Sequence, residues 1–165
     1  MAVPIAIRWK KKPVDRARLA RLVRVVLTGE GRRGARVGIV LADDAALQRL
    51  NADFRGKDKV TDVLSFPADD DDSEDGRYLG DIAISLERAA EQAPRFGNRF
   101  PAEVDRLVVH GLLHLCGYDH HAPADGRRMK ARERHYLDAP ASSLAGHAPR
   151  QPRAGRAPRG TRAGR

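Results

Sequence analysis

The 165-residue sequence has one cysteine and no long hydrophobic run. Because Cys116 stands alone, no disulfide can form within the chain. No segment approaches the roughly 18 apolar residues of a membrane span, and the apolar stretch at 3–7 is too short for the hydrophobic region of a signal peptide. We therefore expect a protein of the reducing cytoplasm that is not embedded in a membrane.

Acidic residues are too few to balance the basic ones. The chain has 31 Lys and Arg against 22 Asp and Glu, which gives a formal net charge of +9. Such a balance indicates a polyanionic partner, most often nucleic acid and less often a membrane surface. Composition alone leaves open the alternative of a basic surface that only contacts water.

The C-terminal segment 139–165 has no acidic residue, and Leu144 is its only large apolar residue. Its six arginines carry two thirds of the net charge, and Pro and Gly recur throughout. A segment of this kind cannot repay its ordering entropy by burying a core. We therefore predict a folded domain at 1–138 and a disordered basic tail at 139–165. The tail either binds RNA phosphates or serves as a solubilising extension.

Strand and helix patterns alternate along residues 1–138. Apolar runs and period-2 alternation predict strands at 3–9, 36–42, 62–68 and 78–85. Helical periodicity and capping residues predict helices at 14–28, 44–54, 86–92, 100–116 and 123–138, with an acidic loop at 69–77. The expected fold is a single α/β domain in which a small mixed four-stranded sheet packs with about five helices.

Histidine is concentrated in one stretch, because four of the six histidines fall within residues 110–121. His110 and His114 are four residues apart on an expected helix, so their rings lie on one face. Both rings can then reach one ion at zinc–nitrogen distances of about 2.0–2.1 Å. Gly117 permits the chain to reverse after the helix, which returns His120 to the same point.

Three converging histidines predict a metal centre with ligands His110, His114 and His120. A zinc ion with three protein ligands and an open fourth position is typical of catalysis, whereas structural sites are closed by four ligands. Cys116 is expected to point elsewhere as a small buried residue, and His121 is expected to be a bystander. The alternative is a chance pair of helix-surface histidines, which the third histidine after a correctly placed glycine disfavours.

One absence within the motif is informative. The spacing H-x3-H-x2-G-x2-H is that of a family of zinc proteases, which carry a glutamate directly after the first histidine as general base. Here that position is Gly111. The metal can still acidify a water molecule, but the base of the protease is missing.

Three segments together carry a resemblance to a known family. They are LNADFRGKDKVTDVLSFP (50–67), LGDIAIS (79–85) and HGLLHLCGYDH (110–120), and they occur in the family's order. On these segments the sequence resembles the YbeY endoribonucleases, also described as rRNA maturation factors. The resemblance covers about residues 1–138 and excludes the arginine-rich tail.

The resemblance implies a zinc-dependent, single-strand-specific endoribonuclease, a hydrolase of RNA phosphodiester bonds. It implies a role in 3′-end maturation of small-subunit 16S rRNA and in ribosome quality control. The expected partners are single-stranded RNA, rRNA, the ribosome or its small subunit, and protein factors of ribosome assembly. The family's zinc ligands correspond to His110, His114 and His120, and its catalytic-site arginine corresponds to Arg55. Asp81 and Asp119 lie within family motifs without a defined role.

Chemistry suggests how these residues act on RNA. Arg55 is suited to hold the charge that develops on a phosphate, because its planar guanidinium matches phosphate oxygens bidentately. Asp119 either orients a histidine or caps the turn after Gly117, and a role as general base is a weaker alternative. Basic side chains that line an RNA path or simply face solvent are Lys57, Lys59, Arg127, Arg128 and Arg132.

Two other functions remain open at this point. The first is a non-catalytic ribosome-assembly or RNA-binding factor whose zinc only stabilises the fold. The second is a metalloprotease, which ligand spacing favours and Gly111 disfavours.

Overall fold

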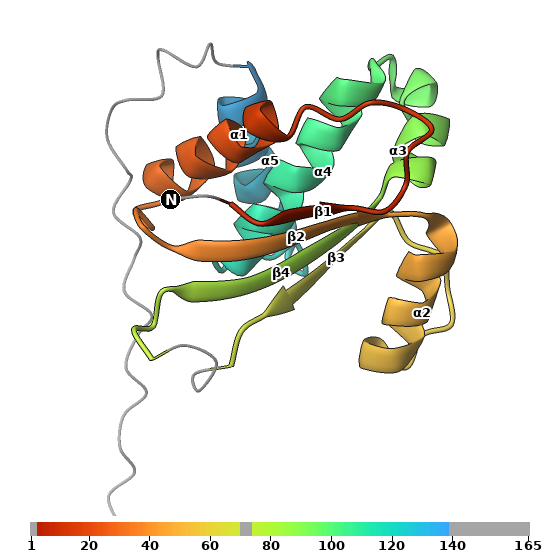
Figure 1. The fold of residues 1–165 in the computed structure, drawn as a ribbon. Helices are drawn as coiled ribbons and strands as arrows, with labels where there is room; N and C mark the ends of the chain where they lie inside the picture. Colours follow the sequence, from red (N-terminus) through yellow and green to blue (C-terminus); the bar gives the residue numbers. More distant parts are fainter. Residues whose placement is uncertain (1–2, 70–73, 139–165) are drawn as a thin grey trace, which may run out of the picture.

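The computed structural model describes residues 3–69 and 74–138 (Figure 1). The predicted tail at 139–165 and four residues of the predicted acidic loop lie outside this part. Within it, the strands are Ile5–Ile7 (β1), Arg36–Ala42 (β2), Val63–Pro67 (β3) and Tyr78–Ser85 (β4). They form one sheet in the order β1-β2-β4-β3, and β3 alone runs antiparallel to its neighbour. The predicted small mixed four-stranded sheet is confirmed.

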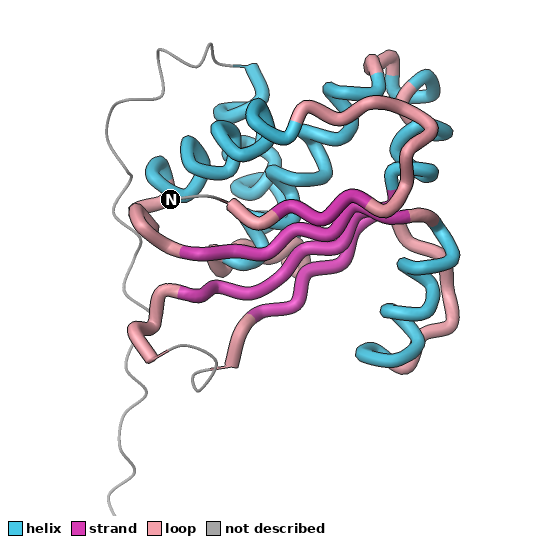
Figure 2. Tube along the Cα trace, viewed as in Figure 1, coloured by secondary structure: helices cyan, strands magenta, loops and turns pink. Residues whose placement is uncertain are grey.

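The described residues also form five α-helices and one short 3₁₀ helix (Figure 2). The helices are Arg16–Gly29 (α1), Asp44–Arg55 (α2), Leu86–Gln92 (α3), Phe100–Leu115 (α4) and Pro123–Asp138 (α5), with Pro94–Phe96 (η2) before α4. Side-chain caps explain three of the starts, because Asp15, Asp43 and Ser85 each accept a hydrogen bond from a backbone N–H in the first turn. The single α/β domain is confirmed.

Element boundaries differ from the prediction mainly at the first strand. The alternation at 3–9 predicted seven residues, but only Ile5–Ile7 pair with β2. β1 lies at the edge of the sheet and pairs with β2 alone, so the strand ends where its pairing with β2 ends. Helix α1 extends to Gly29, one residue further than predicted.

The sheet separates two unequal apolar layers. One face is covered by α1, α4 and α5 (Figure 1). On this face Ile39, Leu41, Ile82 and Ile84 pack against the helices. The opposite face carries α2, which forms a smaller cluster of Ala42, Leu47, Leu64 and Ala83. Alternation along each strand assigns successive residues to these two faces.

Helix α4 is the central element of the larger layer. Nine of its residues are buried, and its side chains are apolar almost all round. A helix of this kind must pack on every side, and α4 contacts α1, α3, α5, β3 and β4. The two histidines near its C-terminal end are therefore held by a rigid support. No helix in the described part of the chain is long and apolar enough to cross a membrane.

Candidate metal centre

The chain reverses directly after α4, as the position of Gly117 predicted. Gly117 has φ 99°, in the region that favours glycine. Its N–H donates to the His114 carbonyl at 3.0 Å, and the Tyr118 N–H donates to the Leu113 carbonyl at 3.0 Å. This pair of bonds is a Schellman motif, which satisfies the last carbonyls of the helix. The turn fixes where the following residues begin.

Three histidines meet beside this turn. One ligand nitrogen from each of His110, His114 and His120 lies within 4.8 Å of the other two. The ring centroids are 4.7 Å apart for His110 and His114, 5.1 Å for His114 and His120, and 6.0 Å for His110 and His120. The structure therefore brings together the three residues that the sequence selected as metal ligands.

The neighbouring candidates stay outside the cluster. His121 is 88% exposed at its side chain and lies 3.4 Å from Asp119. Cys116 is buried, and burial raises the pKa of its thiol to about 11, which leaves it protonated and unreactive at neutral pH. Both observations agree with the expectation that neither residue is a ligand.

The rings of His110 and His114, here called the inner rings, are oriented by hydrogen-bond acceptors that face their Nδ1 atoms. His110 Nδ1 lies 2.6 Å from Glu133 Oε1 on α5, and His114 Nδ1 lies 3.0 Å from the Tyr118 carbonyl oxygen. Because a carbonyl can only accept, Nδ1 of His114 must carry the proton. A neutral imidazole has one N–H, so the Nε2 atom keeps a free lone pair. This is the arrangement that metal-binding histidines use.

The donor set fits a metal ion. The Nε2 atoms of His110 and His114 are 3.2 Å apart. Two lone pairs facing one another repel unless a cation lies between them. Ligand nitrogens around a tetrahedral ion at about 2.0–2.1 Å are separated by roughly 3.3 Å. Burial, followed by the proximity of His110, lowers the pKa of His114 and keeps its ring neutral for binding.

A buried polar cluster anchors the turn that follows α4. Glu30, directly after α1, accepts hydrogen bonds from the Tyr118 hydroxyl at 2.9 Å, Arg132 Nε at 2.9 Å and the Tyr136 hydroxyl at 2.7 Å. Burial and Glu30 together raise the pKa of Tyr118. Gly29 makes room, because a Cβ there would lie 2.8 Å from Cε1 of Tyr136. Tyr118, whose backbone carbonyl orients His114, is thereby joined to α1 and α5 through Glu30.

Arg132 corrects one expectation from the sequence. It was a candidate for the RNA path, yet its side chain is only 17% exposed and its guanidinium binds Glu30. Arg127 and Arg128 are exposed, in agreement with either of their two expected roles.

Sequence reasoning missed Glu133 and Glu30. Glu133 lies one helical turn after the buried Met129, so it faces inward on α5. An acidic residue on the buried stripe of a helix was the available signal. No comparable local signal marked Glu30, because its partners are 88 to 106 residues away in the sequence.

Gly111 has a packing role that the motif did not reveal. A Cβ at this position would lie 2.8 Å from Cγ2 of Ile82 on β4. The position therefore faces the sheet at close approach, and a glutamate does not fit there. Ser65 on β3 donates its hydroxyl hydrogen bond to the Gly111 carbonyl at 3.2 Å, which fixes the contact further.

Arg55 lies across β3 from the histidines. It is the last residue of α2, and its Nη2 donates to the Ser65 carbonyl at 2.7 Å. The Ser65 hydroxyl in turn binds the carbonyl of Gly111, the residue after His110. Two hydrogen bonds through Ser65 thus connect Arg55 to the ligand-bearing helix.

The two family-motif aspartates differ in place. Asp119 Oδ1 accepts from the His120 backbone N–H at 2.6 Å, which agrees with its expected role in capping the turn. Asp81 is exposed on β4 beside Gly38. Since Ile82 and Ile84 face α4, Asp81 faces the other side of the sheet and does not join the histidines.

The fold and the site define a single-domain α/β protein with three histidines that could hold a metal ion at the end of its central helix. Comparison with known proteins agrees. The family model described as "Endoribonuclease YbeY" matches residues 4–140. The chain belongs to this family, and the resemblance seen in the sequence is confirmed.

Individual relatives support the assignment. The chain is 50% identical over 134 residues to "Endoribonuclease YbeY" of Roseiflexus sp. (strain RS-1), covering 76% of this chain and 84% of the relative. It is 43% identical over 149 residues to "Endoribonuclease YbeY" of Anaeromyxobacter dehalogenans (strain 2CP-C), covering 88% and 76%. The solution structure of TM1509 from Thermotoga maritima is similar with a TM-score of 0.57 and 29% identity, covering 82% of this chain and 87% of that one.

Proposed function

We propose that this protein is a zinc-dependent endoribonuclease that cleaves single-stranded RNA. The observation that carries the proposal is the histidine cluster with its oriented Nδ1 atoms, in a chain whose relatives are named endoribonucleases. The role follows the family resemblance and comprises rRNA processing, including 3′-end maturation of 16S rRNA, and ribosome quality control. Its partners are rRNA, the small ribosomal subunit and assembly factors.

Each residue of the site has a chemical task. His110, His114 and His120 would hold a zinc ion, and Glu133 and the Tyr118 carbonyl fix the rings of His110 and His114. When bound, zinc would supply a water molecule of lowered pKa and would polarise a phosphoryl oxygen. Arg55 is exposed and donates one hydrogen bond within the described part of the chain, so its guanidinium fork remains accessible to phosphate oxygens. Arg55 and His114 are the proposed catalytic residues.

The chain offers a matched control for the metal test. His114→Ala removes a ligand, whereas His121→Ala removes an exposed histidine seven residues further on that is outside the cluster. We expect His114→Ala to lose the metal and at least a thousand-fold in cleavage of single-stranded RNA, of the order that loss of a metal-activated nucleophile brings. His121→Ala should retain both. Metal content, cleavage rate and circular dichroism are measured on each full-length variant.

Arg55→Ala tests the phosphate contact separately. It should bind zinc normally and lose about a hundred-fold in cleavage, because charge stabilisation in the transition state is removed. Full activity in either Arg55→Ala or His114→Ala contradicts the role of that residue. A wild-type protein that holds zinc, cleaves no RNA and unfolds when the zinc is removed supports the non-catalytic alternative instead.

A further inference from the structure

The most exposed large apolar side chain of the described residues is Phe54, at 70%. It is the residue before Arg55, in the last turn of α2. Its ring contacts the ring of Phe66 on β3, with centroids 5.4 Å apart and an interplanar angle of 64°. Arg55 lies over the same Phe66 ring at 6.0 Å. An edge-to-face contact leaves most of the Phe54 ring open to solvent.

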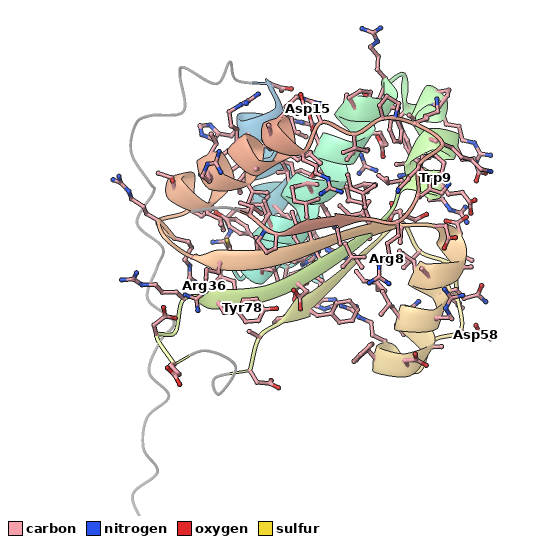
Figure 3. The ribbon with its side chains drawn as sticks, in the orientation of Figure 1. Arg8, Trp9, Asp15, Arg36, Asp58 and Tyr78 are labelled. Atoms are coloured by element: carbon pink, nitrogen blue, oxygen red, sulfur yellow. The ribbon has the colours of Figure 1, made fainter. Side chains whose placement is uncertain are left out.

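Charged residues flank Phe54 in the sequence. Arg55 precedes a loop with the exposed Lys57 and Lys59, and Asp53 precedes the ring. The acid within the loop, Asp58, accepts a hydrogen bond from Gln48 at 2.8 Å and lies beside α2 (Figure 3). A single accessible ring within a charged surface is too small for a protein interface. Its size and setting match one nucleobase.

The loop that carries the lysines is held in place. Gly56 ends α2 with φ 64°. The side-chain amide of the buried Asn51 donates to the Lys59 backbone carbonyl at 3.0 Å. The backbone carbonyl of Asn51 accepts from the Lys57 backbone N–H at 3.2 Å. The cations and the ring are therefore presented together by a fixed backbone, which lowers the ordering cost of binding.

Phe54 also adjoins the path from Arg55 to the metal site. Arg55 binds the Ser65 carbonyl, and Ser65 binds the carbonyl next to His110. β3 is one of the two outer strands, and α2 and α4 both contact it, from opposite faces of the sheet. An RNA strand with a phosphate at Arg55 has an adjacent base within reach of Phe54.

We propose that Phe54 is a base-stacking residue that binds an unpaired base of the RNA substrate next to the phosphate held by Arg55. The inference rests on the proposed endoribonuclease function and deepens it. It accounts for single-strand specificity, because a base within a duplex is already stacked on both faces and is not available to the ring.

A substitution series at Phe54 separates stacking from simple apolar contact. Steady-state cleavage of a fluorogenic single-stranded oligoribonucleotide is measured on zinc-loaded, full-length protein. Phe54→Ala and Phe54→Leu should each raise KM about ten-fold with little change in kcat, whereas Phe54→Trp should keep the wild-type KM. Leucine retains the apolar volume and loses the aromatic face, so a wild-type KM in Phe54→Leu overturns the proposal.

Phe96 is the matched control. It is 65% exposed, lies on η2 and has Arg106 over its ring at 5.5 Å. Its chemistry resembles that of Phe54, but it precedes α4, and His110 and His114 lie about 15 Å and 21 Å along that helix from its first residue at 1.5 Å per residue. Phe96→Ala should leave KM unchanged. An equal rise in KM for Phe96→Ala and Phe54→Ala contradicts a specific stacking site.

A fluorescence signal tests the contact directly. The chain has one tryptophan, Trp9, which is 9% exposed and packs 6.1 Å from Phe100, across the sheet from Asp58 (Figure 3). Rapid mixing of Phe54→Trp with excess single-stranded RNA should quench its emission before cleavage begins. The wild type, Phe96→Trp and a duplex of the same sequence should show no such quench.

The outcomes distinguish the two proposals. If the wild type cleaves single-stranded RNA and KM is the same in all Phe54 variants, the stacking proposal is wrong and the endoribonuclease proposal stands. If the zinc-loaded wild type neither binds nor cleaves single-stranded RNA, both proposals are wrong.

Discussion

The two sides of β3 are built differently. On the α4 side, the Nδ1 atoms of both His110 and His114 are paired, and the buried Glu30 behind them is bonded to the half-buried Arg132. On the α2 side, Arg55 and Phe54 are exposed and have few partners. A metal ion is bound by ligands held at fixed, short distances, whereas an RNA chain binds to side chains that are exposed at the surface. The difference separates a preorganised centre from an accessible surface.

The largest loss of stability is expected from Glu30→Ala. Removing this carboxylate leaves the largely buried Arg132 guanidinium without its counter-charge and two tyrosine hydroxyls without their acceptor. We expect the free energy of unfolding to fall by about 3–5 kcal/mol, measured by urea denaturation of the zinc-loaded protein.

An exposed glutamate provides the control for this change. Glu91 on α3 pairs with Arg95 at 3.2 Å, and its side chain is 49% exposed. Glu91→Ala should change stability by less than about 0.5 kcal/mol. Similar losses in the two variants would contradict the claim that the α4 side depends on its buried polar cluster.

A smaller effect, on metal affinity, is expected from Glu133→Ala. Without the carboxylate, the His110 ring loses the acceptor that fixes its proton on Nδ1. Zinc affinity should fall about 10–100-fold, measured by competition with a chromophoric chelator. Glu133→Gln keeps an acceptor oxygen and should fall less, and the exposed neighbour Arg134→Ala should bind zinc as the wild type does. An unchanged affinity in Glu133→Ala would refute the orienting role.

A smaller loss of stability again is expected from Gly111→Ala. The added methyl would meet Ile82 at 2.8 Å, and overpacking of a core costs about 1–3 kcal/mol. The better helix propensity of alanine offsets roughly 1 kcal/mol of this. The net loss should be about 1 kcal/mol by thermal unfolding, and Ile82→Val in the same chain should restore part of it. A stabilised Gly111→Ala would show that α4 and β4 are less tightly packed.

The smallest change in stability is expected from Arg55→Lys. A lysine can still donate to the Ser65 carbonyl, so the free energy of unfolding should stay within about 0.5 kcal/mol. Cleavage should nevertheless fall, because an ammonium lacks the planar fork that matches a phosphate. Chemical denaturation and cleavage rates on one preparation test both halves. If Arg55→Lys lost stability together with activity, the α2 side would depend on fixed contacts as the α4 side does, and the contrast between the two sides would be wrong.

The sequence predicted the parts of the molecule that local patterns determine. The ligand set falls within eleven residues, and helix periodicity plus one glycine specifies its geometry. The sheet and the five helices followed from alternation and capping residues such as Asp43 and Ser85.

Other parts depend on contacts that no local pattern contains. Glu133 reaches His110 from 23 residues away, and Glu30 reaches Tyr118 across 88. The inward position of Arg132 follows from where α1 ends, which its own helix does not reveal. Exposure of Phe54 likewise depends on how α2 packs against β3, so the periodicity of α2 alone did not single it out.

The dependence of the histidines on α5 has a consequence for synthesis. All three ligands are translated before α5, but the carboxylate that orients His110 and two of the groups that bind Glu30 belong to this last described helix. A nascent chain therefore contains the ligands before it contains their supports. We therefore expect high metal affinity only after α5 has left the exit tunnel and docked, so that the metal-loaded form appears late in synthesis.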